Sequence, residues 1–281
     1  VNGASVEMTL LAFRLGRLSV AEPARVEELV AAAPRKPQAA SLRPSPKAQG
    51  AIDATGATGE LKRLLENRAA ELEAFQDTAY ALEYVAWVAR TAAASASVVP
   101  DSTELAETVA RYLYKLMAYK DEYEVARLLL AQRDSGELGK MFGGDVRMYW
   151  HMHPSFLRAL GVKNKVKLGA WFTPFLWMLR AMKRLRGGPL DLFGLGQVRR
   201  TERQLIAEYR DLLTSALEKL TPENHAAVVS MAALPDMVRG YENVKMDMVR
   251  EYRAKLAEAK AEIGIGATGK PAGTAEIVRA A

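Results

Sequence analysis

The sequence predicts a mainly α-helical protein, a bundle of helical hairpins with a short β-ribbon near residues 145–168. Over most of the chain, apolar residues recur at alternating steps of three and four, which is the repeat of a helix with one buried face. After Gly143 and Gly144 the repeat changes to alternation, which is typical of a strand. A chain of 281 residues has room for one or two domains with hydrophobic cores.

The composition limits the classes of function. The chain contains no Cys, which excludes disulfides, thiolate zinc sites, Cys nucleophiles and iron–sulfur ligation by this chain. This fits a cytoplasmic protein, and we expect that location. The net charge of +6 is unevenly spread, because eleven Lys and Arg but only two acidic residues lie between Arg158 and Arg203. Such a zone can meet nucleic acid, a membrane surface or an acidic protein.

Four regions are expected along the chain. Residues 1–33 have a helical pattern, whereas residues 34–59 are rich in Pro, Ala, Ser and Gly and predict a linker or mobile loop. Residues 60–263 form the helical domain with the ribbon, and residues 264–281 are expected to be a disordered tail. The chain begins with Val1 in an amphipathic helix that resembles neither a signal peptide nor a transit peptide, so we expect a piece of a longer protein.

One long helix is predicted directly after the linker and ends at “TAAASASVVP”. Its apolar stripe, with Arg68 as an interruption, consists of Leu61, Leu65, Leu72, Phe75, Ala79, Leu82 and Ala86.

The next predicted helix holds four of the ten tyrosines of the chain. Asp101 lies three residues before Glu104 and predicts a capping-box variant at its start. The apolar stripe consists of Leu105, Val109, Tyr112, Leu116, Tyr119, Tyr123, Ala126 and Leu130. Because three of the four tyrosines lie on this stripe, the buried face of a helical hairpin is favoured over an aromatic ligand-binding box.

The predicted ribbon carries most of the candidate chemistry. In “DVRMYWHMH” apolar and polar residues alternate, and “VKNKVKL” places three lysines at alternate positions. The polar face is a candidate docking face for an anion or a partner, and its residues are Arg147, His151, His153, Lys163, Lys165 and Lys167. A metal site on the two histidines is the alternative, which the flanking cations disfavour.

The segment “AWFTPFLWMLRAMKRLR” is too short to span a bilayer, and Pro174 and Arg180 interrupt its apolar run. It predicts a core or docking helix with a basic end. The alternative is a helix lying in a membrane interface, with Trp171, Phe172 and Trp177 inserted and with Lys183, Arg184 and Arg186 on the headgroups. Three more helices follow: one with a Thr201–Gln204 capping box, one from Thr221-Pro222 to Pro235, and one from about Val244 to Ile263.

Motifs of self-contained catalysis are missing. Gly264 to Lys270 matches a phosphate-loop pattern, but a charged helix precedes it and Pro271 replaces the required Ser or Thr. There is no G-x-S-x-G elbow, no H-E-x-x-H and no carboxylate pair with glycosidase spacing. We therefore expect no catalytic, cofactor-binding or metal-binding residue in this chain.

Several blocks together resemble the C-terminal region of the large single-chain indolepyruvate ferredoxin oxidoreductases, which belong to the 2-oxoacid:ferredoxin oxidoreductase family. The blocks are “YKLMAYKDEYEVARLLL”, “RAMKRLRGGPLDLFG”, “RRTERQLIAEY”, “LTPENHAAVV” and “LPDMVRGYENVK”. The opening “VNGASVEMTLLAFRLGRL” is similar to the end of the preceding gamma-like α/β domain in those enzymes, which implies that residues 1–33 are the tail of such a domain.

The resemblance implies an enzyme that uses thiamine diphosphate, Mg and 4Fe-4S clusters to decarboxylate aryl 2-oxo acids oxidatively, forming acyl-coenzyme A and reducing ferredoxin. The thiamine motif, the cluster cysteines and the G-x-G-G-Q-G pattern of the gamma-like domain are not found in this chain, so no catalytic residue is carried over. The resemblance thus implies an accessory, structural domain, inactive alone, within a homodimeric enzyme whose partners are its own catalytic domains, ferredoxin and coenzyme A.

Two classes of function remain open. In the first class, the chain is an accessory domain of a thiamine-dependent enzyme, and its basic ribbon face would attract ferredoxin or the phosphates of coenzyme A. In the second, the chain is a stand-alone helical adaptor whose basic face binds an anionic partner, namely a membrane surface, an acidic protein or nucleic acid.

Overall fold

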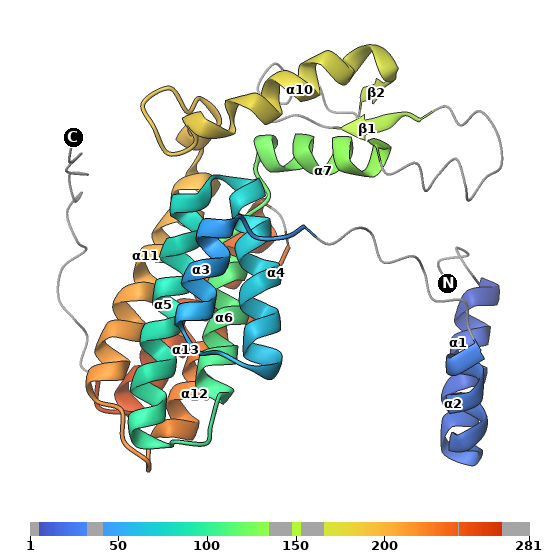
Figure 1. The fold of residues 1–281 in the computed structure, drawn as a ribbon. Coiled ribbons are helices and arrows are strands. Elements are labelled where there is room, and N and C mark those ends of the chain that lie inside the picture. Colours follow the sequence, from blue (N-terminus) through green and yellow to red (C-terminus); the bar gives the residue numbers. More distant parts are fainter. Residues whose placement is uncertain (1–5, 33–41, 135–147, 153–165, 241, 266–281) are drawn as a thin grey trace. The chain divides into compact units, whose positions relative to one another are not determined.

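The computed structural model describes residues 6–32, 42–134, 148–152, 166–240 and 242–265 (Figure 1). The mainly α-helical fold is confirmed, with two strands of three residues each in the described part. The chain divides into two compact units, residues 1–41 and residues 42–281. None of the described helices is long and apolar enough to cross a membrane. The predicted tail, residues 266–281, lies outside the described residues.

The first unit contains two helices, α1 (Val6–Ala21) and α2 (Pro23–Ala32). The prediction of helix for this region is confirmed, but the helix is interrupted at Glu22 because Pro23 has no N–H to donate and starts a new helix. Many of its large apolar side chains are exposed, among them Leu11, Phe13 and Val20.

Part of the predicted linker is a helix, α3 (Pro46–Ala54), which corrects the expectation for residues 34–59. Ser45 is its N-cap and accepts a hydrogen bond from Ala48 N–H, and Pro46 occupies the first turn. Ile52 of α3 is buried in the main core. The Pro- and Ser-rich composition concealed a helix start, since Ser followed by Pro is favourable at a helix N-terminus.

The long helix predicted after the linker is two helices, α4 (Gly59–Phe75) and α5 (Thr78–Val98). Asp77 caps α5 by accepting a hydrogen bond from Tyr80 N–H at 2.9 Å. The break shifts the helical phase, so the predicted stripe fails beyond Phe75. Ala86 is exposed, while Tyr84 and Val88 are buried instead.

The tyrosine segment also forms two helices, α6 (Glu104–Met117) and α7 (Glu122–Asp134). Thr103, not Asp101, is the N-cap of α6, so the predicted capping box is wrong. Tyr119 and Tyr123 are buried, and Tyr112 and Tyr114 pack at the edge of the main core. The structure therefore places these tyrosines in packing roles, and the hairpin of α5 and α6 is formed as expected.

The ribbon consists of β1 (Trp150–Met152) and β2 (Val166–Leu168), which pair antiparallel with His151 opposite Lys167. Trp150 and Leu168 are buried, and Lys167 is exposed, which confirms the predicted alternation at these positions. A 3-10 turn, η1 (Ala170–Phe172), leads into α10 (Thr173–Ala181) and a second turn, η2 (Met182–Leu185). Helix α10 packs on α7 (Figure 1).

The C-terminal part contains η3 (Phe193–Leu195), α11 (Gln197–Glu218), α12 (His225–Ala233), η4 (Leu234–Met237) and α13 (Glu242–Glu262). Two predicted starts are wrong. Helix α11 begins before Thr201, which is buried within it, and α12 begins after the Thr221-Pro222 turn, with Asn224 as its N-cap. The predicted last helix is confirmed to within a few residues.

The second unit has two hydrophobic cores. The main core lies within the bundle of α3 to α6 and α11 to α13. The smaller core joins α7, the ribbon and α10, and its buried residues are Ala126, Leu130, Trp150, Leu168, Phe172, Leu176 and Leu179.

Candidate functional site

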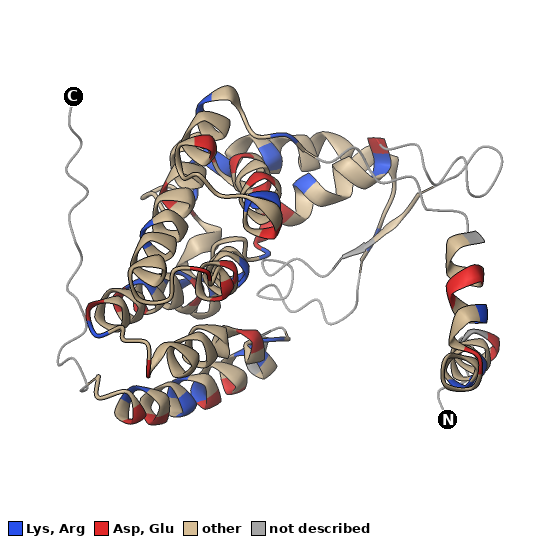
Figure 2. Cartoon of the chain, turned by 60° about the horizontal axis from the view of Figure 1, so that its bottom comes forward, with Lys and Arg blue, Asp and Glu red and all other residues tan. Residues whose placement is uncertain are grey.

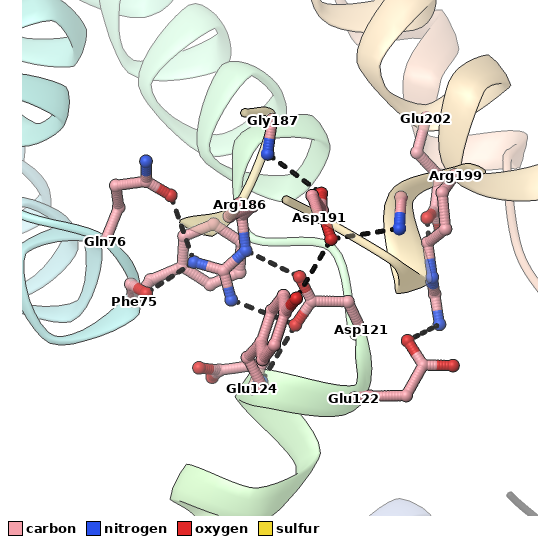
Figure 3. A network of polar contacts seen from close by, with 12 residues as sticks. Phe75, Gln76, Asp121, Glu122, Glu124, Arg186, Gly187, Asp191, Arg199 and Glu202 are labelled. Carbon is pink, nitrogen blue, oxygen red and sulfur yellow. Dashed lines mark hydrogen bonds and ion pairs between the residues drawn. The ribbon is translucent and has the colours of Figure 1, made fainter. Parts of the chain in front are cut away.

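The most unusual feature of the described residues is a network of buried and half-buried charges, which we call the polar junction (Figure 3). It is built by the start of α7, the loop after η2 and the first turns of α11. Its charged residues are Asp121, Glu122, Glu124, Arg127, Arg186, Asp191, Arg199, Glu202 and Arg203.

Arg186 and Asp121 form the centre of the junction. Both side chains are only 4% exposed. Arg186 Nε donates to Asp121 Oδ2 at 2.5 Å and Nη2 donates to Oδ1 at 2.9 Å, which is the two-pronged geometry that suits a guanidinium and a carboxylate. Arg186 Nη1 donates to the carbonyl oxygen of Phe75 at 2.5 Å and to Gln76 Oε1 at 3.1 Å. The guanidinium therefore ties α7 to the end of α4.

Asp121 has a second role at the start of α7. Its Oδ1 accepts a hydrogen bond from Glu124 N–H at 2.8 Å, which satisfies one of the free N–H groups of the first turn. Arg186 also lies over the ring of Phe75, with 3.6 Å from its guanidinium carbon to the ring centroid. Hydrogen bonds and ring stacking together offset the loss of hydration of this buried pair.

Asp191 organises the loop that follows Arg186. Its Oδ2 accepts from Gly187 N–H at 2.8 Å, and its Oδ1 accepts from Gly194 N–H at 3.0 Å and from the hydroxyl of Tyr123 at 3.0 Å. Burial and the neighbouring carboxylate of Asp191 raise the pKa of Tyr123 above its usual value, so this hydroxyl remains a donor. A β-carbon on Gly194 would lie 2.2 Å from Asp191 Oδ2, and only glycine fits there.

Two further ion-pair chains extend the junction to other helices. Arg199 lies 2.8 Å from Glu202 and 3.4 Å from Glu122, and Lys245 of α13 lies 2.5 Å from the other oxygen of Glu202. In the second ion-pair chain, Arg127 lies 2.7 Å from Glu124 within α7 and 2.8 Å from Glu71 of α4.

The charged groups of the polar junction hold the helices and the loop together. The carboxylates and guanidinium groups face one another, and their hydrogen bonds are directed into the protein. Within the described ranges, no group of three or more His, Asp or Glu residues is placed to hold a metal ion.

A buried serine–histidine contact lies outside the polar junction. Ser95 Oγ is 3.0 Å from His225 Nε2, which links α5 to α12, and Ser95 is fully buried.

The predicted docking face is described only in part. Arg147, His153, Lys163 and Lys165 lie outside the described residues, as does most of the phosphate-loop pattern after Gly264. The structure brings His151 and Lys167 together as backbone partners, and Lys167 Nζ lies 3.9 Å from the centroid of the exposed Tyr149 ring.

Sequence reasoning missed the polar junction. It placed Arg186 only at the end of the predicted core, docking or interfacial helix, and it gave Asp191 no role. Asp121 and Arg186 are 65 residues apart in the chain, so no local pattern could pair them. The glycines on both sides of Asp191 were the available signal, because a carboxylate between glycines can accept bonds from backbone N–H groups.

A sequence model described as “Family of unknown function (DUF6537)” matches residues 61–258. This range runs from α4 into α13 and includes all residues of the polar junction. No curated protein and no solved structure matches the chain.

Proposed function

The chain belongs to this family of unknown function, DUF6537, and we propose that it is an accessory, structural domain of an indolepyruvate-type 2-oxoacid:ferredoxin oxidoreductase. In such an enzyme the thiamine diphosphate, the Mg and the iron–sulfur clusters belong to other parts of the protein. This domain contributes a packed helical scaffold and no catalytic residue.

The observation that carries the proposal is where the blocks of resemblance lie in the fold. The block of residues 114–130 supplies Asp121, the block of residues 180–194 supplies Arg186 and Asp191, and the block of residues 199–209 supplies Arg199 and Glu202. Three of the five blocks of resemblance therefore supply residues of the polar junction, whereas the block of residues 220–229 does not.

The last block of resemblance reaches the same network through Lys245. It supplies Lys245, which pairs with Glu202, and Asp236, whose carbonyl oxygen accepts from Lys115 Nζ at 2.6 Å. Contacts of this kind hold helices together and leave no reacting group facing a substrate. They support a shared scaffold as the basis of the resemblance.

Enzyme activity that accompanies the chain tests the proposal. An antibody to the recombinant chain is used to precipitate the protein from its source cells, and the precipitate is assayed for viologen reduction that requires both an aryl 2-oxo acid and coenzyme A. The expected result is an active precipitate, with no activity from the recombinant chain of 281 residues alone. A precipitate that contains the chain but lacks this activity contradicts the proposal.

A further inference from the structure

Helix α10 is apolar on both of its faces. Its inner face, with Leu176 and Leu179, is buried against α7 in the smaller core. On the outer face, Trp177 is 53% exposed, and Trp171 in the preceding turn is 72% exposed. Helices that are apolar all round are usually covered on every side, whereas the described residues leave this outer face open.

The exposed side chains of α10 form one continuous strip. Trp171, Pro174, Met178 and Ala181 follow one another at steps of three and four, and all four are exposed. Trp177 lies beside this strip, since it is three residues from Pro174 and four from Ala181. The strip is therefore a surface of the folded helix rather than a set of scattered apolar residues.

The strip continues onto the ribbon. A β-carbon on Gly169 would lie 3.5 Å from side-chain atoms of both Trp171 and Tyr149, so these two aromatic side chains flank the same glycine. Lys167 Nζ lies over the ring of Tyr149. We call this surface the tryptophan face, and its residues are Tyr149, Lys167, Trp171, Pro174, Trp177, Met178 and Ala181. The exposed Arg184 follows Ala181 by three residues, in η2.

The exposed charges of the segment that carries the tryptophan face have one sign. Every exposed charged residue described between residues 166 and 200 is a cation, and these are Lys167, Arg180, Arg184 and Arg200. Figure 2 shows where Lys and Arg (blue) and Asp and Glu (red) lie along the ribbon of the chain. The one acidic residue of this segment, Asp191, is buried in the polar junction. A surface that covers the tryptophan face therefore gains from carboxylates at its rim.

We infer that the tryptophan face docks a folded protein surface that offers an apolar pocket rimmed by Asp and Glu side chains. Trp, Met and Arg are the residue types enriched at protein interfaces, and Trp and Arg dominate their binding energy. A membrane surface is the alternative occupant of such a face, and cross-linking to lipid is the outcome that identifies it. If the proposed function is right, the docked surface belongs to the catalytic part of the same enzyme; only that identity rests on the proposed function.

Site-specific photo-crosslinking tests the inference in the full chain, within its source cells. A photoreactive phenylalanine analogue replaces Trp177 in one variant and Trp171 in a second, and the control variant carries it at Ala254, an exposed position of α13. The expected result is a cross-link from position 177 or 171 to a protein peptide that contains Asp or Glu beside apolar residues, with a yield about tenfold above the control. Arg184→Glu in the same background should lower that yield about threefold, because it repels the acidic rim.

The other outcomes overturn the inference. They are cross-links to lipid alone, cross-links to a second copy of this chain, and yields at positions 177 and 171 that equal the yield at Ala254. A cross-link to an acidic protein with no part in 2-oxo acid oxidation would keep the docking face and contradict the proposed function, so the two failures are distinguishable.

Discussion

At the scale of single residues, the fold depends on polar groups that are buried in pairs. Arg186 directs its hydrogen bonds to Phe75 at the end of α4, to Gln76 directly after it, and to Asp121 directly before α7. A buried pair of this kind contributes little net stability compared with apolar packing, but removal of one partner leaves the other charge uncompensated. The junction therefore makes the arrangement of α4, α7 and the Asp191 loop specific.

Replacement of this arginine should be costly. We expect Arg186→Met to lower the free energy of unfolding by about 3–5 kcal/mol, because Asp121 remains buried without its cation. Denaturant titration followed by circular dichroism measures the effect. The control is Arg250→Met, which removes an exposed ion pair with Asp247 and should cost less than about 1 kcal/mol. Equal losses in the two variants would contradict a structural role for the junction.

A second substitution tests the anchoring of the Asp191 loop. Gly194→Ala should lower the free energy of unfolding by about 1–3 kcal/mol, since the added carbon would collide with the carboxylate of Asp191. The matched control is Gly50→Ala in α3, where nothing lies within 4 Å of the new carbon. That variant should be more stable by about 0.5–1 kcal/mol, because alanine favours helix. The same titration compares the two variants, and an unchanged stability of Gly194→Ala would show that the loop is not held in this way.

At the scale of elements, the sequence was sufficient to predict which parts are helical but not where the helices break. Apolar periodicity continues through Gln76 and through Ala118, and it predicted one helix where the structure has two. These breaks are fixed by contacts that are remote in sequence, such as the bond from Arg186 to the carbonyl oxygen of Phe75. The ribbon is confirmed at the described positions, because strand alternation is a local pattern. Its register, with His151 opposite Lys167, was not predicted, since register also depends on the geometry of the connection between the strands.

Helix α3 was missed, and its attachment should depend on pH. Ser45 donates its N–H at 2.8 Å and its hydroxyl at 2.5 Å to the carboxylate of Glu73. Burial raises the pKa of Glu73, but these hydrogen bonds lower it more, so that it lies below the ordinary value of 4.5. Since the pKa is lower in the folded state, the contact stabilises the fold above pH 4.5 and is lost as the pH falls through the lowered pKa.

Amide hydrogen exchange measures this local effect. The protection factors of α3, residues 46–54, should fall below about pH 4 in the wild-type protein by more than those of α12, residues 225–233. In Glu73→Gln the protection of α3 should be lower at neutral pH and should change less on acidification. A pH dependence of α3 that persists in Glu73→Gln would assign the effect to another group.

At the scale of the whole molecule, the second unit is a helical bundle with a smaller core of α7, α10 and the ribbon attached through the polar junction. Sequence motifs are a sufficient basis for the expectation about catalytic residues. They could not predict the tryptophan face. Periodicity showed that α10 is apolar but not which side is buried, because the answer depends on its contact with α7. The family match covers residues 61–258, from α4 into α13, and the function of that family is unknown.

The central claim is that this chain works as an accessory domain of a thiamine-dependent oxidoreductase. The most direct measurement is the intact mass and the cofactor content of the protein that an antibody to this chain isolates from its source cells. The account predicts a polypeptide well above 30.8 kDa that carries iron and thiamine diphosphate. The contradicting result is a polypeptide near 30.8 kDa that has neither cofactor and is isolated without any protein that contains iron and thiamine diphosphate.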